Sequence, residues 1–224
     1  VLDVEPFPYQ KKLLLDQKKR LVACMGRQTG KTTTIAIKAI HYAISNRGVT
    51  VLITSPSLRQ SMIMFNRISS LVFSSPLKSH VTRSTRTVIQ FGNRSEIIAL
   101  PASRNLLRGY TAQMIICDEC AFMPEDLITQ VIFPMLSTTD GYAIFLSTPW
   151  GRDHFFYQAF MDPKYSVHRV KSNECPLIRP EFLEEMKRNM TEQAFRMEYE
   201  AEFVEAASSY FSQDLIRSCV DPAI

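Results

Sequence analysis

Residues Leu21–Thr34 have the sequence LVACMGRQTGKTTT, in which an apolar run ends at a turn and a helical pattern follows. A strand that leads through a glycine-containing turn into a helix leaves several backbone N–H groups unpaired, and the positive end of the helix dipole points at the same place. Lys31 adds a positive charge there, and Thr32 adds a hydroxyl at the position that binds magnesium in such loops. The stretch therefore predicts a cradle for the phosphates of a nucleoside triphosphate.

The loop departs from the regular pattern GxxxxGKS or GxxxxGKT. Met25 occupies the position of the first glycine, and the glycine follows one residue later as Gly26. A GKT tripeptide alone is a frequent accident, and the stretch would then be an ordinary helix N-terminus. The order of strand, turn, GKT and helix favours the phosphate cradle.

The composition is that of an ordinary globular protein. The chain has 224 residues, of which 46% are hydrophobic, so it can bury a full core. No apolar run has the length of a membrane span, and the start VLDVEPFPYQ lacks the pattern of a signal peptide, so we expect an intracellular protein with no membrane partner. Cys24, Cys117 and Cys120 lie in or beside apolar segments, which suits reduced thiols and argues against zinc.

Charge is distributed unevenly along the chain, although the net charge is only +4. Segment 78–108 carries six Lys or Arg against the single acid Glu96, whereas segment 174–205 carries nine Glu against four Lys or Arg. A basic segment beside a nucleotide site points to a polyanionic partner, and the alternative is an ordinary solvated face. The candidates for contact with nucleic acid are Arg83, Arg86, Arg94 and Arg104.

Strand and helix patterns alternate along most of the chain, which indicates an α/β fold. We expect strands at 21–25, 49–54, 114–117, 142–146 and 165–170, and a hairpin formed by 87–91 and 95–100. We expect helices at 8–16, 31–45, 57–72, 124–136, 153–161, 180–189 and 191–202. Strands separated by helices of this length pair in parallel, so the prediction is a doubly wound sheet with the nucleotide at the carboxyl ends of its strands.

A second chemical motif, MIICDE, covers residues 114–119. Alternate side chains of a strand point to opposite faces, so only a bend at the strand end would let both acids act at one site. Asp118 would then hold Mg²⁺ through water, and Glu119 would act as general base on the attacking water. The alternative is a pair of surface acids at a strand end.

Two weaker motifs fit the same site. Ser147, Thr148 and Pro149 follow a strand that we expect beside the strand of Asp118, and their hydroxyls would lie on the γ-phosphate side. The Gln10 amide is able to pair with both N6 and N7 of adenine. Without this context, the first motif is a strand end and the second a helix N-terminus.

Together the segments PYQ, GRQTGKTT, LLRGYTAQMIICDE and LSTPWG resemble, in this order and spacing, the ATPase domain of the large terminase subunit of tailed bacteriophages and related viruses. In that family the domain is the motor that packages DNA into a procapsid. The resemblance extends from about Phe7 to Phe203. It accounts for the irregular cradle, since terminases typically carry an arginine near the loop start and lack the regular first glycine.

The resemblance implies an ASCE-type P-loop NTPase core at residues 1–172, with a mainly parallel sheet flanked by helices, a small C-terminal lid subdomain at 173–208, and a linker at 209–224. It implies ATP and Mg²⁺ as cofactors, with Thr32 and Asp118 at the metal and Glu119 as the catalytic glutamate. The residues that it implies for nucleotide binding are Gln10, Gly26, Arg27, Gln28, Thr29, Gly30, Lys31, Thr32, Thr33, Ser147 and Thr148.

The resemblance also implies a pentameric ring on a portal protein in the host cytoplasm, with double-stranded DNA in the channel and a small terminase subunit as partner. The nuclease domain of large terminases is not expected here, because Glu205, Asp214 and Asp221 are scattered acids. Arg108 is expected to complete catalysis at a neighbouring subunit's ATP, and Arg27 to sense nucleotide and move the lid; the reverse assignment, with Arg27 acting in cis, stays open.

Other classes of protein fit less well. A helicase or other nucleic-acid translocase with the same core would normally need a second such domain and further motifs. A nucleotide-binding regulator that does not hydrolyse would be expected to lose Glu119, yet the acid is there.

Overall fold

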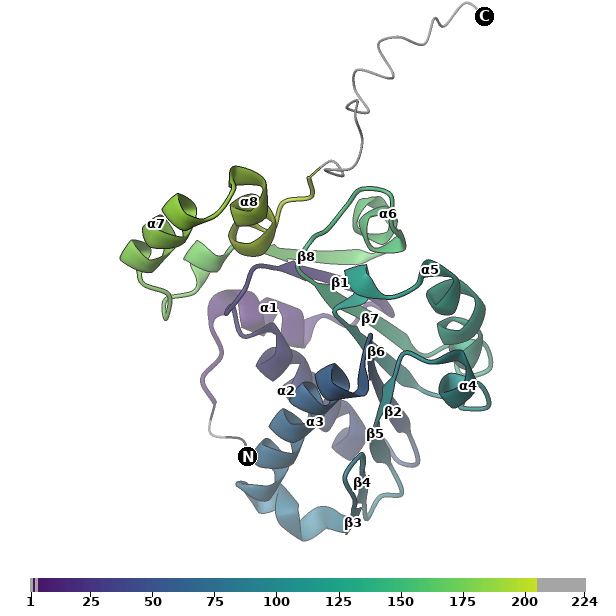
Figure 1. Ribbon diagram of the computed structural model, residues 1–224. Helices are drawn as coiled ribbons and strands as arrows, with labels where there is room; N and C mark the ends of the chain where they lie inside the picture. Colours follow the sequence, from purple (N-terminus) through teal and green to yellow (C-terminus); the bar gives the residue numbers. More distant parts are fainter. Residues whose placement is uncertain (1, 3, 205–224) are drawn as a thin grey trace, which may run out of the picture.

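A single sheet of eight strands runs through the part of the chain that a computed structural model describes, which is Leu2 and residues 4–204. The strands are β1 (Arg20–Met25), β2 (Thr50–Ser55), β3 (Val81–Ser84), β4 (Val88–Phe91), β5 (Glu96–Pro101), β6 (Met114–Asp118), β7 (Tyr142–Ser147) and β8 (Ser166–Val170). Their order across the sheet is β3-β4-β5-β2-β6-β7-β1-β8 (Figure 1). All neighbours from β5 to β8 pair in parallel, whereas β3, β4 and β5 pair antiparallel.

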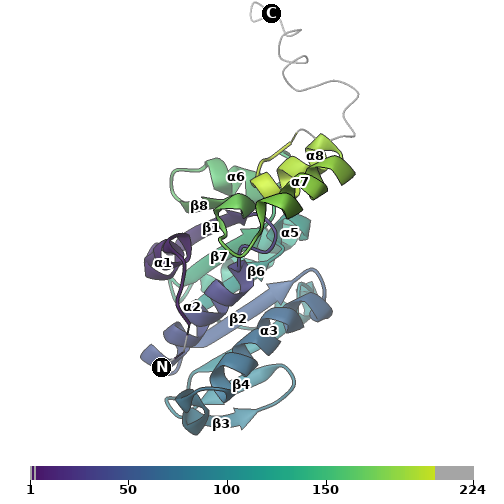
Figure 2. The ribbon, with the colours of Figure 1, turned by 90° about the vertical axis from the view of Figure 1, so that its left-hand side faces the viewer.

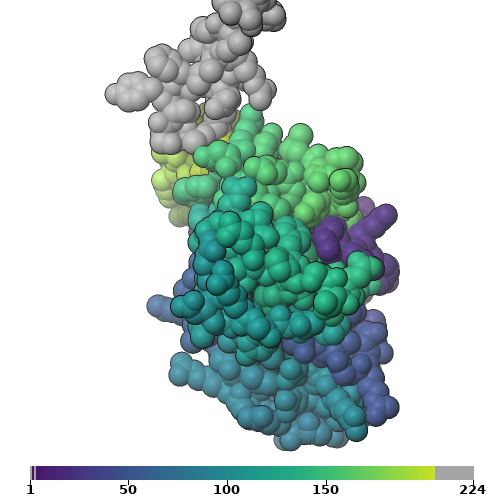
Figure 3. Space-filling view, turned by 90° about the vertical axis from the view of Figure 1, so that its right-hand side faces the viewer, coloured from purple at the N-terminus to yellow at the C-terminus, as the bar shows by residue number. Residues whose placement is uncertain are grey.

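Helices cover both faces of this sheet. One face carries α1 (Pro8–Leu15), α2 (Lys31–Ser45) and α3 (Leu58–Phe73) (Figure 2). The other carries α4 (Arg104–Leu107), α6 (Phe155–Met161) and the short turns η2 (Cys120–Phe122), α5 (Glu125–Leu127), η3 (Ile128–Ile132) and η4 (Pro134–Leu136). Figure 3 views the molecule from that side, where teal and green residues of these segments form a continuous surface.

The remaining helical segments lie at the two ends of the sheet. Next to β3 is the 3-10 helix η1 (Pro76–His80). Beyond β8 the chain forms η5 (Ser172–Glu174), α7 (Pro180–Asn189) and α8 (Glu192–Glu200). No helix in the described part of the chain combines the length and the apolar character needed to cross a membrane.

The core consists of two layers, one on each face of the sheet. Leu21 and Met25 of β1 pack with α2 and α3, whereas Val22 and Cys24 pack with α6 and the turns after β6, because successive strand residues point to opposite faces. All four side chains are fully buried. Burial on both faces explains why the parallel strands read as continuous apolar runs.

Most of the predicted elements are present within one or two residues of their expected ends. Helix α2 has its predicted bounds, and it begins directly after Gly30, which adopts the left-handed conformation with φ 79°. The predicted hairpin is the antiparallel pair β4 and β5. The predicted mainly parallel sheet flanked by helices is therefore confirmed.

The single helix predicted at 124–136 was wrong. The structure has one helical turn, a π-helical segment and a 3-10 turn, and the Phe133 N–H donates to the Ile128 carbonyl, five residues back. Pro134 lacks an N–H, and its ring would collide with a carbonyl of a regular helix. A π-helical turn before Pro134 is the geometry that the chain adopts instead.

Candidate active site

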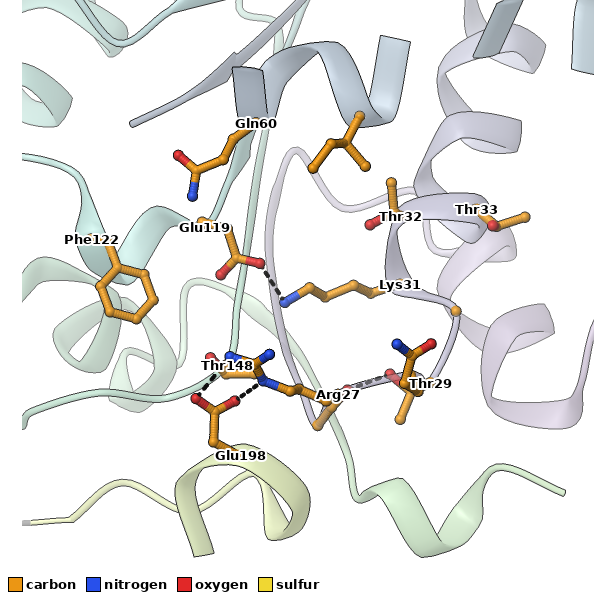
Figure 4. Close-up of a pocket in the computed structure, with 14 residues that line it drawn as sticks. Arg27, Thr29, Lys31, Thr32, Thr33, Gln60, Glu119, Phe122, Thr148 and Glu198 are labelled. Atoms are coloured by element: carbon orange, nitrogen blue, oxygen red, sulfur yellow. Dashed lines mark hydrogen bonds and ion pairs between the residues drawn. The ribbon is translucent and has the colours of Figure 1, made fainter. Parts of the chain in front are cut away.

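The parallel strands β1, β6 and β7 end at one edge of the sheet, and an open pocket of about 660 Å³ lies there (Figure 4). Strand β7 lies beside β6, the strand that carries Asp118, as predicted. On its other side is β1, the strand that leads into the loop. The residues that line the pocket are Gly26, Arg27, Gln28, Thr29, Gly30, Lys31, Thr32, Thr33, Gln60, Ile63, Glu119, Phe122, Thr148 and Glu198. The whole predicted cradle from Gly26 to Thr33 therefore faces this pocket.

The loop is held in a shape that directs Lys31 into the pocket. Gln28 and Gly30 both have positive φ angles, 61° and 79°, and the Thr29 hydroxyl donates to the Gly26 carbonyl at 2.8 Å. The Lys31 ammonium lies 3.1 Å from a Glu119 carboxylate oxygen. A lysine and a carboxylate that meet across an open pocket, beside the N-terminus of α2, form a site for a polyanion and a reacting water.

The bend that the acid pair requires is present. Glu119 adopts the left-handed conformation with φ 55° and ψ 43°, which turns its side chain into the pocket beyond the end of β6. Asp118 stays in the strand, 5% exposed, and accepts a hydrogen bond from the Glu119 N–H at 3.1 Å. Burial raises the pKa of Asp118 to about 6, and nearby Lys31 opposes that rise. Asp118 therefore lies behind the pocket wall, whereas Glu119 forms part of it.

Buried hydroxyls flank the strand of Asp118 on both sides. Ser147 ends β7, and Thr54 and Ser55 end β2, the two strands that pair with β6. None of these three hydroxyl oxygens has a hydrogen-bond partner among the described residues. Thr54 and Ser147 lie on the sheet face of Cys117 and Cys24, whereas Ser55 lies on the same face as Asp118. Buried polar groups are nearly always paired, so the Ser55 oxygen is the one that a water or a hydrated ion beside Asp118 would satisfy. Thr148, the residue after Ser147, lines the pocket itself.

The predicted adenine contact does not lie in the pocket wall. The Gln10 side-chain oxygen accepts from the Phe7 N–H at 2.9 Å, and its amide nitrogen donates to the Thr29 carbonyl at 3.3 Å. The Tyr9 hydroxyl donates to the same carbonyl at 2.9 Å. Tyr9 and Gln10 of α1 thus hold the loop at the Thr29 carbonyl. The sequence did not predict this role for Tyr9.

The two candidate arginines lie in different surroundings. Arg27 points at α8, where its Nε donates to a Glu198 carboxylate oxygen at 2.5 Å and its backbone N–H donates to the Glu198 carbonyl at 2.7 Å (Figure 4). The hydrogen bond to Glu198 raises the pKa of Arg27. Arg108 directly follows α4, is exposed, and does not line the pocket.

The structure explains the displaced glycine of the loop. A β-carbon on Gly26 would lie 2.5 Å from the Ser172 hydroxyl and 2.9 Å from the Tyr199 carbonyl. Gly26 does not adopt a left-handed φ. A glycine is needed because the segment after β8 and helix α8 come too close to leave room for a side chain. Among the pocket residues that the sequence did not predict, Gln60, Ile63 and Glu198 come from distant segments, whereas Phe122 lies three residues after Glu119.

Comparisons with known proteins agree with this geometry. Residues 22–218 match the family described as terminase large subunit, T4likevirus-type, N-terminal. The large terminase subunit of Thermus virus P23-45 is 28% identical over 250 aligned residues, which cover 95% of this chain and 51% of that protein. The chain thus spans about half the length of the curated relatives it matches.

Solved structures give the same result. The large terminase ATPase domain of Thermus phage P74-26 superposes with a TM-score of 0.82 at 27% identity, covering 91% of this chain and 96% of that domain. The large terminase of a thermophilic bacteriophage, solved in complex with ADP, superposes at 0.75 with 16% identity over 89% of this chain and 54% of that one, a likeness of fold alone. By its sequence match and its fold, the chain belongs to the family of terminase large subunits.

Proposed function

We propose that this chain hydrolyses ATP with the help of Mg²⁺, and that hydrolysis drives translocation of double-stranded viral DNA into a procapsid. The observation that carries the proposal is the meeting of Lys31 and Glu119, 3.1 Å apart, across a pocket lined by the loop and the N-terminus of α2. Relatives of this family include terminases whose structures hold ADP or ATP-γ-S.

Each polar group has a place in the reaction. Lys31 and the N–H groups at the start of α2 bind the β- and γ-phosphates, so Lys31 leaves Glu119 when nucleotide enters. Glu119 is then free to orient a water molecule in line with the γ-phosphorus and to accept its proton as the bond to ADP breaks. Thr148 lines the same pocket, close to Arg27 and Glu198 in Figure 4, and we assign it the sensing of the departing phosphate.

The residues present fit a magnesium ion. Mg²⁺ usually binds through one or two carboxylates together with phosphates and several waters. Asp118 would supply one carboxylate and Thr32 a hydroxyl, and the unpaired oxygen of Ser55, at the end of the neighbouring strand β2, lies on the same face of the sheet as Asp118. Bound there, the ion would neutralise charge on the transferring phosphoryl group.

The proposal includes the division of the chain that the family resemblance implies. We assign residues 1–172 to the ATPase core and 173–208 to a lid, since α8 contacts the loop through Arg27 and Glu198. The linker predicted at 209–224, with Asp214 and Asp221, lies outside the described residues, as does Glu205. The proposal includes a pentameric ring in the host cytoplasm with a portal protein and a small terminase subunit as partners.

Hydrolysis is tested by steady-state release of phosphate from ATP with and without Mg²⁺ and double-stranded DNA. We expect Glu119→Gln to bind nucleotide and lose hydrolysis by at least about a hundredfold, since it removes only the base. Lys31→Ala should lose nucleotide binding as well. If Glu119→Gln retains full hydrolysis, the proposal is wrong.

The arginine assignment is tested by mixing inactive subunits. If Arg108 acts on a neighbour, Arg108→Ala subunits keep a complete site and Glu119→Ala subunits keep a working arginine, so a mixture regains ATPase activity. Arg27→Ala mixed with Glu119→Ala should regain none if Arg27 serves its own site. If neither mixture regains activity at any ratio, Arg108 does not act on a neighbour and the assignment of Arg27 in cis replaces it. Recovery with Arg27→Ala alone would instead make Arg27 the residue that acts on a neighbour.

A further inference from the structure

We propose that the aromatic pair Phe122–Trp150 positions Glu119 for attack on the γ-phosphate; the inference rests on the ATPase function proposed above. Neither ring is among the residues expected to bind nucleotide, although Trp150 lies in the segment LSTPWG, and the pair joins the segments that follow β6 and β7. Phe122 and Trp150 are therefore positioning residues that act through Glu119.

Glu119 needs support from its neighbours. Its left-handed backbone is unfavourable for a residue with a β-carbon, and such conformations persist only where the surroundings fix them. The turn that follows supplies one restraint, because the Phe122 N–H donates to the Glu119 carbonyl at 3.0 Å. Within this turn Cys120 and Ala121 are buried, whereas the Phe122 ring is 44% exposed and turns to the pocket beside Glu119 (Figure 4).

The partner of that ring comes from the next strand. Trp150 follows Ser147, Thr148 and Pro149, and its ring centroid lies 5.1 Å from that of Phe122 at an interplanar angle of 58°. Tilted aromatic pairs at this distance attract each other beyond their area of contact. Trp150 is itself 51% exposed, so the two rings add little to the core. What they do is hold the Glu119 turn against the segment that carries Thr148.

A hydrogen bond from His154 also connects the segment after β7 to the segment after β6. His154 Nε2 lies 2.8 Å from the Met123 carbonyl, and His154 Nδ1 accepts from the Phe156 N–H at 3.1 Å. Because Nδ1 accepts, Nε2 carries the proton and donates to Met123. This hydrogen bond and the buried packing of η2 against α6 also join the two segments, but the Phe122–Trp150 contact includes a side chain that lines the pocket.

The consequence is a loss of rate rather than of binding when the pair is broken. Lys31 and the loop bind the phosphates without help from either ring, so KM for ATP should change by less than about threefold. Misplacing Glu119 should lower kcat at least about tenfold, since small displacements of a reacting group are costly in rate. Phe122→Ala and Trp150→Ala remove one shared contact, so the double variant should be no slower than the slower single variant.

The experiment measures kcat and KM for ATP in the wild type, both alanine variants, the double variant and Trp150→Phe, which keeps an aromatic ring and should restore most of the kcat. Phe73→Ala, which removes an exposed ring at the end of α3, is the matched control. Thermal unfolding checks that each variant is folded. A Trp150→Ala variant within twofold of an active wild type, or single losses that multiply in the double variant, overturns the inference.

Fluorescence provides a test that does not depend on turnover, because Trp150 is the only tryptophan in the sequence. Removing its neighbour in Phe122→Ala should shift its emission to the red and remove the change that ADP or ATP-γ-S produces in the wild type. Emission and nucleotide response that are the same in Phe122→Ala and wild type contradict the inference. A wild type that binds nucleotide but never hydrolyses it contradicts the proposed function instead.

Discussion

Gly26 has no side chain, and this allows the loop to lie close against the helical segments beyond β8. The Ser172 hydroxyl and the Tyr199 carbonyl occupy the space that a side chain would need, and the Ser172 hydroxyl also donates to the Arg27 carbonyl at 2.8 Å. We expect Gly26→Ala to lower the free energy of unfolding by about 2 kcal/mol, as overpacking does, and to weaken ATP binding. Urea unfolding and KM for ATP measure the two effects.

Gly92→Ala is the matched control for that substitution. A β-carbon on Gly92 would meet only the His80 carbonyl at 3.8 Å and a Thr82 methyl at 3.9 Å, which are ordinary contacts. We expect its stability to stay within about 0.5 kcal/mol of the wild type. Equal effects at the two glycines would contradict the role given to Gly26.

The buried carboxylate of Asp118 should reduce the stability of the free protein. Burial raises its pKa in the folded state from the ordinary 3.8 to about 6, so ionisation favours the unfolded chain. At pH 8 the cost is about 2 to 3 kcal/mol, and it declines as the pH falls through 6 towards 3.8. In EDTA, Asp118→Asn should therefore be more stable than the wild type at pH 8 and lose most of that advantage near pH 4.

Urea denaturation at the two pH values measures this difference. The same variant should have no Mg²⁺-dependent ATPase activity, because a neutral amide is a poor ligand for the ion. If Asp118→Asn is less stable than the wild type at pH 8, other groups in the fold stabilise the ionised Asp118 carboxylate by more than its burial costs.

At the scale of elements, a buried lysine fixes the helix that supports the loop. Lys38 of α2 is 8% exposed, and its ammonium donates to the carbonyls of Leu13, Leu14 and Asp16 at the C-terminus of α1. These are the carbonyls that a helix end leaves unpaired. Lys38→Met would leave them without donors, so we expect a loss of about 2 to 3 kcal/mol in stability and a higher KM for ATP.

Lys12→Met is the control, because Lys12 is an exposed residue of α1 itself. It removes the same charge without removing these hydrogen bonds. Chemical unfolding and KM for ATP should separate the two variants; a Lys38→Met protein as stable as Lys12→Met would contradict the role of Lys38 as a cap for α1.

Elements with a strong local pattern were predictable, and those fixed by distant contacts were not. Helix α2 has an apolar face and a glycine before its first residue, and both signals are local. Strand β3 was missed because three of its four residues are exposed and polar, so it has no alternation. It is a strand because it pairs with β4.

The same distinction applies to the site. The loop residues and Glu119 were predictable because consecutive residues form the motifs. Glu198 could not be predicted, because it reaches Arg27 only after α8 packs on the loop. Gln60 and Ile63 reach the pocket from α3, whose position depends on its packing against β2 and β5.

At the scale of the whole molecule, the two charged segments lie at opposite ends of the sheet. The hairpin of β3 and β4 lies at one end, and α7 and α8 lie beyond β8 at the other, as both Figure 1 and Figure 2 show. Arg83, Arg86 and Arg94 at the hairpin end are exposed. Arg104 is committed to an ion pair with Asp126 and a hydrogen bond to Gln130 at 3.1 Å.

For the DNA translocation proposed above, this arrangement predicts which surface would bind double-stranded DNA. Arg83 lies on the edge strand β3 and Arg86 directly after it, and neither forms an ion pair among the described residues. We therefore expect Arg83→Ala/Arg86→Ala to weaken DNA binding. The slope of log affinity against log salt should fall by about 2, because two phosphate contacts are lost. Fluorescence anisotropy of a labelled duplex at several salt concentrations measures the slope. Lys187→Ala/Arg188→Ala removes the same charge from α7 and should leave it unchanged. Because the two variants have the same net charge, equal slopes would mean that DNA responds to the overall charge and that the hairpin is not its binding surface.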